Sequence, residues 1–206
     1  MRFADRREAG RRLAGELDPY AGRDDVVVLG LPRGGVPVAA EVAHALGAPL
    51  DVFVVRKLGV PGHRELAFGA IASGGVCVLN SAVVITERLT EEQIERVIAA
   101  ERAELDRRVA SYGGGAPLPD RTAILVDDGL ATGATMHVAA AAVREAGARV
   151  VVCAAPVAST QAVARLRAIA DDVRTVTTPS WFGAVGSFYD DFAETSDDEV
   201  RAALSR

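Results

Sequence analysis

Ala123-Ile-Leu-Val-Asp-Asp-Gly-Leu-Ala-Thr-Gly-Ala-Thr-Met136 joins four apolar residues to two adjacent carboxylates and then to a run of small residues. The apolar residues predict a buried strand, and open α/β sheets bind ligands beyond the carboxyl ends of such strands. Thr132 and Thr135 supply hydroxyl donors where the next helix is expected to begin. Unpaired backbone N–H groups and the helix dipole favour an anion there, which predicts a phosphate cradle. The residues small enough for the backbone to approach a ligand closely are Gly129, Ala131, Gly133 and Ala134.

Two carboxylates beside such a cradle need a different partner, because Asp127 and Asp128 would repel a bare phosphate. Ribose hydroxyls donate hydrogen bonds, so they fit the acids directly or through the water shell of a magnesium ion. The stretch therefore predicts a phosphoribose site. The alternative interpretation is an acidic strand end followed by a threonine that caps the next helix. A Walker A loop is excluded, because the stretch contains no Gly-Lys-Ser/Thr.

The same stretch closely resembles the motif with which type I phosphoribosyltransferases bind phosphoribosyl pyrophosphate (PRPP). The resemblance implies that Asp127 and Asp128 hold the ribose hydroxyls, while residues 131–135 surround the 5′-phosphate. Gly129 is expected to belong to the same PRPP-binding site. It also implies the family's fold, an α/β parallel sheet with helices on both faces and a small hood. We therefore expect a single domain over residues 1–206, with residues 181–206 as the hood or a C-terminal flap. Magnesium is the cofactor that the resemblance implies.

A second segment, residues 31–35, has the sequence Leu-Pro-Arg-Gly-Gly and resembles the pyrophosphate-binding loop of the same family. Gly34 and Gly35 permit unusual backbone angles, and their N–H groups can face an anion. Arg33 can place its planar guanidinium on two phosphate oxygens. The alternative is an ordinary turn between a strand and a helix, with an arginine on the surface.

A third segment, residues 55–62, has the sequence Val-Arg-Lys-Leu-Gly-Val-Pro-Gly. It resembles the flexible catalytic loop of adenine-type enzymes, although its spacing is one residue shorter. The resemblance implies that Arg56 and Lys57 meet the departing pyrophosphate and that the loop closes to exclude water. Glycine, proline and charge predict a mobile loop over residues 57–65. The alternative is two exposed cations at the end of a strand.

The acceptor is left open by the sequence. Hypoxanthine-guanine enzymes have an acid three residues after the acid pair, where this chain has Ala131, as adenine-type enzymes do. Residues 181–190 are loosely similar to the base-binding hood of purine salvage enzymes. That similarity implies that Trp181 or Phe182 stacks on a base, that Val185 presents backbone groups and that Asp190 approaches magnesium. The alternative is that these aromatic residues simply pack a C-terminal flap.

Alternating strand and helix patterns over the rest of the chain predict βαβ units. The expected strands are residues 26–29, 51–55, 68–72, 76–79, 83–85, 123–126, 150–154 and 173–176. Helices are expected near the N-terminus, over residues 38–46, 135–146 and 161–169, and after Ser196. A long helix over residues 90–112, begun by a capping box of Thr90 and Gln93, could pack within the domain or against a partner. A homodimer is one such arrangement.

Composition and charge argue against several classes of protein. A net charge of −5 argues against a general nucleic-acid-binding protein. No apolar run reaches the ~18 residues that a membrane span needs, and the charged N-terminus has no apolar signal core, so a cytoplasmic protein without membrane contact is expected. Cys77 and Cys153 both lie in apolar runs and are expected to be reduced core thiols.

Three functions compete at this stage. The first is a phosphoribosyltransferase that passes phosphoribose from PRPP to a nitrogen nucleophile, such as a nucleobase, in nucleotide salvage or a related pathway. The second is a regulatory protein that binds PRPP or a nucleotide without turnover. Arg33, Arg56 and Lys57 favour the enzyme, because binding alone needs them less. The third, a phosphatase-like fold with Asp127 as nucleophile, lacks a matching lysine.

Overall fold

Five parallel strands form the main sheet of the computed structural model, which describes residues 1–113 and 115–205, apart from the side chains of Arg64 and Glu65. Every neighbouring pair in this sheet is parallel, which confirms the predicted α/β class. Across the sheet the strands are β2 (Leu50–Val52), β1 (Val26–Gly30), β6 (Thr122–Val126), β7 (Val150–Val157) and β8 (Asp172–Thr177).

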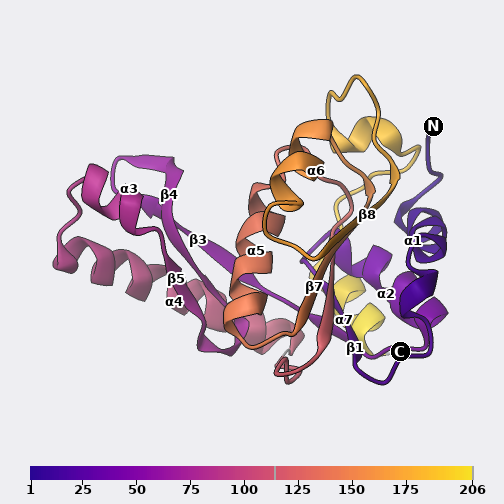
Figure 1. Cartoon of the computed structure of the whole chain (residues 1–206), viewed down its shortest axis with the longest axis horizontal. Helices are drawn as coiled ribbons and strands as arrows, with labels where there is room; N and C mark the ends of the chain where they lie inside the picture. Colours follow the sequence, from indigo (N-terminus) through magenta and orange to yellow (C-terminus); the bar gives the residue numbers. More distant parts are fainter. Residues whose placement is uncertain (114, 206) are drawn as a thin grey trace.

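Helices cover both faces of this sheet, as expected (Figure 1). Alternate residues of β1 serve the two cores, because successive side chains of a strand point to opposite faces. Val26 and Val28 pack with α1 (Arg6–Gly15) and α2 (Gly35–Leu46). Val27 and Leu29 pack with α5 (Ala134–Glu145) and α6 (Thr160–Leu166) on the other face.

The position of β6 explains why its carboxyl end can hold a site. It lies between β1 and β7, and Val126 is in register with Gly30 on one side and Ala154 on the other. The acid pair that follows Val126 therefore emerges beside the loops that leave two neighbouring strands. This edge of the sheet is where parallel α/β folds bind ligands.

A second sheet and two helices form an arm, which projects from the main sheet at the left of Figure 1. We define the arm as the antiparallel strands β3 (Val55–Val60), β4 (His63–Ala72) and β5 (Cys77–Leu79) with α3 (Ser81–Thr86) and α4 (Glu91–Tyr112).

The arm corrects three expectations. Residues 57–65 lie in the β-hairpin of β3 and β4, which turns at Gly62 with φ 85°, and do not form a loop. Residues 83–85 belong to helix α3 and not to a strand, because Asn80 caps the helix by accepting from the N–H groups of Ala82 and Val83. Cys153 is buried as expected, whereas Cys77 is exposed on β5.

The long helix α4 begins at the predicted capping box of Thr90 and Gln93. It packs within the chain, where Leu105 joins a core cluster with Leu58 and Phe68 of the arm and Val200 of α7 (Asp197–Leu204). One face of α4 is therefore covered by strands of the arm and by α7. Within the described residues, no helix is both long and apolar enough to cross a membrane.

Gly10→Ala should destabilise the fold, because α1 and α2 touch at this residue. An added Cβ would lie 2.7 Å from the carbonyl oxygen of Val38 and 2.8 Å from Cβ of Glu41. We expect the free energy of unfolding to fall by about 1–3 kcal/mol. Gly15→Ala, on the same helix with open space around its Cβ, should be neutral or stabilise by up to about 1 kcal/mol. Urea denaturation of both variants measures this, and equal effects would contradict the close helix contact.

Candidate functional site

The acid pair lies at the end of β6, partly covered by its surroundings. The backbone N–H of Asp127 donates to the carbonyl of Ala154 at 3.2 Å, and that of Asp128 donates to Oδ1 of Asp127 at 2.9 Å. Burial, and then the charge of Asp128, raises the pKa of Asp127. Burial also raises the pKa of Asp128, and the Arg6 guanidinium opposes that rise. The site thus holds two acids whose charges need partners.

The loop after β1 packs directly on this pair. Its Leu31 N–H donates to the Val126 carbonyl at 2.9 Å, and the Pro32–Arg33 peptide bond is cis. A Cβ on Gly34 would overlap the Asp128 carboxylate, and one on Gly35 would lie 2.6 Å from the Val126 carbonyl oxygen. Gly34 has φ −63°, an angle that any residue can adopt, contrary to the expectation from the sequence. The two glycines allow close approach to the acids, and unusual backbone angles are not the reason for them.

The predicted cradle is held in place by β7 and by Ser159, the N-cap residue of α6. Leu130 N–H donates to the Val157 carbonyl at 2.9 Å, and Ser159 Oγ donates to the Ala131 carbonyl at 2.6 Å. Gly133 has φ 67° and precedes the first turn of α5, so this position does need a glycine. Ala131, Thr132 and Thr135 are exposed. The first amides of a helix have no intrahelical partner, so this exposed helix start can bind an anion.

Two groups at this site were missed by the sequence analysis. Arg6, from α1, donates from Nε to Oδ2 of Asp128 at 2.9 Å, and Tyr189 donates from its hydroxyl to the Asp128 carbonyl at 2.6 Å. Burial raises the pKa of Tyr189, which therefore remains a donor. Neither residue lies near the acid pair in sequence, and no local pattern marks either one.

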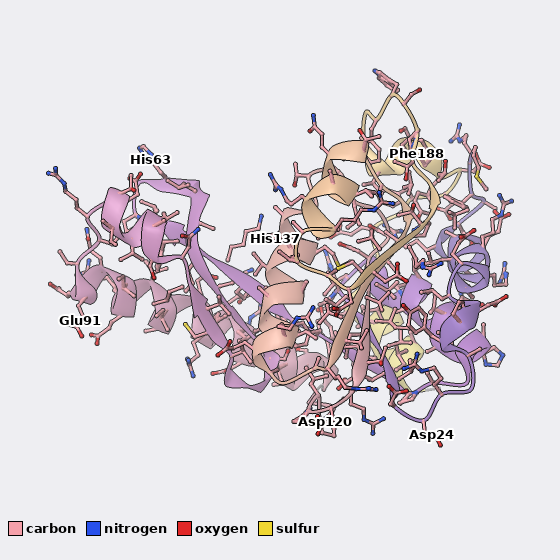
Figure 2. The ribbon with its side chains drawn as sticks, in the orientation of Figure 1. Asp24, His63, Glu91, Asp120, His137 and Phe188 are labelled. Carbon is pink, nitrogen blue, oxygen red and sulfur yellow. The ribbon has the colours of Figure 1, made fainter. Side chains whose placement is uncertain are left out.

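The three cations predicted to meet the pyrophosphate lie in different parts of the structure. Arg33, beside the acid pair, forms an ion pair with Glu194 in the C-terminal tail. Arg56, on the arm, donates from Nε to Glu101 of α4 at 2.8 Å. Lys57 faces a cavity of about 670 Å³ between the arm and α5. His137, labelled in Figure 2, lines the same cavity from α5.

The C-terminal tail covers part of the site. Val185 packs so closely on Gly129 that a Cβ there would overlap its side chain. Phe182 packs against Phe188, labelled in Figure 2, with the ring centroids 5.3 Å apart and the rings tilted by 35°. Trp181 is 76% exposed. Asp190, predicted to approach magnesium, forms an ion pair with Arg2 at 2.9 Å.

A parallel sheet with paired acids at the end of its central strand, beside a glycine loop and an open helix start, defines an α/β domain of the kind that binds phosphorylated ligands. Residues 4–193 match the family model described as the phosphoribosyl transferase domain. The chain belongs to the phosphoribosyl transferase family.

Comparisons with individual proteins agree with this family. Two strains of Mycobacterium tuberculosis, CDC 1551 and H37Rv, each have a relative that is named provisionally as a phosphoribosyl transferase. Each is 51% identical over 99% of this chain but only 46% of its own length, so the chain spans about half of these relatives.

Solved structures share the fold of the chain. The crystal structure of TT1426 from Thermus thermophilus is 47% identical to the chain, with 99% of this chain and 98% of that chain covered and a TM-score of 0.89. The AQ2163 protein from Aquifex aeolicus is 11% identical, with 88% of this chain and 78% of that chain covered and a TM-score of 0.54. The second likeness concerns the fold alone.

Asp127→Asn should stabilise the protein in neutral and alkaline solution but not near pH 4. Because burial raises the pKa of Asp127, the folded state keeps a proton that the unfolded chain loses above about pH 4. Stability contributed by this group therefore falls between about pH 4 and the raised pKa. Asparagine has no such proton, and its Oδ1 can still accept from the Asp128 N–H.

Melting temperatures of wild type, Asp127→Asn and the exposed control Asp106→Asn, recorded from about pH 4 to about pH 9, check this expectation. The gain of Asp127→Asn over wild type should grow with pH, while the control shows no such trend. A gain that does not depend on pH would contradict an Asp127 whose pKa is raised by burial.

Proposed function

We propose that this protein transfers the 5-phosphoribosyl group of PRPP to a nitrogen nucleophile and releases pyrophosphate. The observation that carries the proposal is the meeting of three segments at one edge of the sheet. The acid pair, the Gly34–Gly35 turn packed against it and the exposed start of α5 lie together. A hydroxyl-binding group beside two anion-binding backbone segments matches a sugar that carries a phosphate at each end.

The proposed roles follow from the chemistry of these groups. Asp127 and Asp128 accept hydrogen bonds from the ribose hydroxyls. Gly129 and residues 131–135 hold the 5′-phosphate through backbone N–H groups and threonine hydroxyls. Arg33 and the amides of Gly34 and Gly35 hold the pyrophosphate. The bond from ribose C1 to the pyrophosphate oxygen breaks, its electron pair leaves with pyrophosphate, and a bond from C1 to nitrogen forms.

Such a site accelerates transfer by placing the reactants and by neutralising the charge that develops on the leaving group. Arg33 is available for this role once it exchanges Glu194 for pyrophosphate. That exchange is inexpensive, because exposed ion pairs contribute only about 0–1 kcal/mol and the Glu194 side chain is 80% exposed. Arg56 and Lys57 would add positive charge from the arm, and Arg56 would first leave Glu101.

Magnesium fits this arrangement as a companion of pyrophosphate. The described residues contain no cluster of three or more His, Cys, Asp or Glu side chains that could hold a metal ion, so this part of the chain offers no complete cage. Magnesium is commonly held by one or two carboxylates together with substrate phosphates. Asp127 and Asp128 supply such carboxylates and would reach the ion through its water shell. A bound magnesium ion would neutralise part of the negative charge on the pyrophosphate leaving group. Asp190 could approach the ion only after its ion pair with Arg2 opens.

The tail supports a nucleobase or another flat nitrogen compound as acceptor. Val185 lies against Gly129, next to the acid pair, so the tail forms a cover at that end of the site. We propose that residues 181–206 act as the hood, with Trp181 or Phe182 stacking on the acceptor. The exposure of Trp181 leaves its ring free to do so.

The second candidate is a regulatory protein that binds PRPP or a nucleotide without turnover. One observation favours it, namely that Arg33 and Arg56 are both paired with acids of the chain itself. The two functions differ in a single measurement. An enzyme releases pyrophosphate in a way that depends on an acceptor, whereas a binding protein takes up PRPP and releases none.

A screen of free nucleobases with PRPP and magnesium, with pyrophosphate as the readout, should find at least one acceptor. Asp128→Asn and Arg33→Ala should each lower the turnover rate by on the order of 10²–10³, because each loses a charge-assisted contact to the substrate. Circular dichroism should show that both variants remain folded.

Matched controls are Asp198→Asn and Arg107→Ala, which remove one charge of each sign from exposed positions. Their turnover should equal that of wild type. Full activity in Asp128→Asn and Arg33→Ala would contradict the roles proposed for these two residues. PRPP binding without pyrophosphate release for every base would favour the regulatory protein.

A further inference from the structure

Arg6 is the cation that the structure brings to the acid pair. Among the ion pairs of the described residues, Arg6 alone joins a cation to either acid, with Nε 2.9 Å from Oδ2 of Asp128. The Arg6 side chain is 12% exposed and that of Asp128 is 15% exposed, so water screens this contact only weakly. A charge-assisted contact of this kind is stronger than a neutral hydrogen bond and fixes the orientation of both groups.

The Arg6 guanidinium is itself held on two further sides. Its second nitrogen, Nη1, donates to the Ala193 carbonyl at 2.7 Å. The aromatic ring of Phe192 lies beneath the guanidinium carbon at 4.0 Å from the ring centroid. The side chain therefore has one well-defined position.

The chain termini meet to build this support. The Phe3 N–H donates to the Phe188 carbonyl at 2.8 Å, and the Asp190 N–H donates back to the Phe3 carbonyl at 2.8 Å. Tyr189, which lies between Phe188 and Asp190 in the chain and is 2% exposed, donates from its hydroxyl to the Asp128 carbonyl at 2.6 Å. Asp128 is thus held through its backbone by the tail and through its side chain by α1.

One oxygen of the Asp128 carboxylate accepts from Arg6, and this leaves Oδ1 to accept from a ligand. Without the guanidinium, the carboxylate would lie beside Asp127 with its charge uncompensated and would be free to turn. A turned carboxylate would no longer aim its other oxygen at the ligand, and a protonated one would accept a hydrogen bond less strongly than a charged one. The contact with Arg6 therefore fixes both the orientation and the charge of the Asp128 carboxylate.

We propose that Arg6 is a positioning residue for the sugar, which fixes the Asp128 carboxylate so that its other oxygen accepts a hydrogen bond from a ribose hydroxyl. This inference rests on the proposed function, because it takes Asp128 to be the hydroxyl acceptor. Arg6 acts through Asp128 and not on the phosphate. Its loss should therefore weaken binding of the sugar and spare binding of a phosphate without a sugar.

The test measures dissociation constants for ribose 5-phosphate and for inorganic phosphate by isothermal titration calorimetry. Arg6→Gln should raise the dissociation constant for ribose 5-phosphate by roughly tenfold or more, as expected for the loss of a charge-assisted contact. Affinity for inorganic phosphate should be that of wild type. Arg6→Lys retains a cation without the planar fork, so it should restore part of the loss and carry the test if Arg6→Gln does not fold. The control Arg11→Gln, on the same helix and 60% exposed, should bind both ligands as wild type does.

Each outcome separates this inference from the function on which it rests. Wild-type protein that binds ribose 5-phosphate no better than inorganic phosphate overturns the proposed sugar site, and the role of Arg6 with it. Wild-type protein with a clear sugar preference that Arg6→Gln retains overturns only the role of Arg6. Equal weakening of both ligands in folded Arg6→Gln and Arg6→Lys would show a general structural role and overturn it as well.

Discussion

Two neighbouring carboxylates at the end of the central strand impose the main physical constraint on this protein. Their charges repel each other, and their surroundings keep water largely away, so burial raises the pKa of both. The chain meets this constraint with a guanidinium from Arg6 on one carboxylate and a backbone N–H on the other. A pair kept in such a place at such a cost is typical of a functional site.

The surrounding segments make sense as responses to that pair. Gly34 and Gly35 carry no side chain because the acids and the end of β6 occupy the space where one would lie. The N-terminal segment and the C-terminal tail, which are far apart in sequence, pair with each other, and Arg6 and Tyr189 from these segments both contact Asp128. Residues from both ends of the chain therefore complete a site whose central element lies on β6.

The sequence predicted the main sheet and the strand–acid–helix unit well, because both depend on local patterns. Four apolar residues, two acids and a run of small residues determine a strand, its end and a helix start within one stretch. The arm was predicted poorly because its local signals conflict. Pro61 and Gly62 suggested a loop but form the turn of a hairpin, and three β-branched residues at 83–85 were overruled by the Asn80 cap. Arg6 and Tyr189 could not be found, because only the tertiary fold brings them to Asp128.

A crystal structure of the chain with PRPP and magnesium tests the central claim most directly. The account predicts ribose hydroxyls within hydrogen-bonding distance of Asp127 and Asp128, with the 5′-phosphate on residues 131–135 and Arg6 still bound to Asp128. Ligand bound elsewhere, for instance in the cavity between the arm and α5, with the acid pair free of sugar, would contradict it.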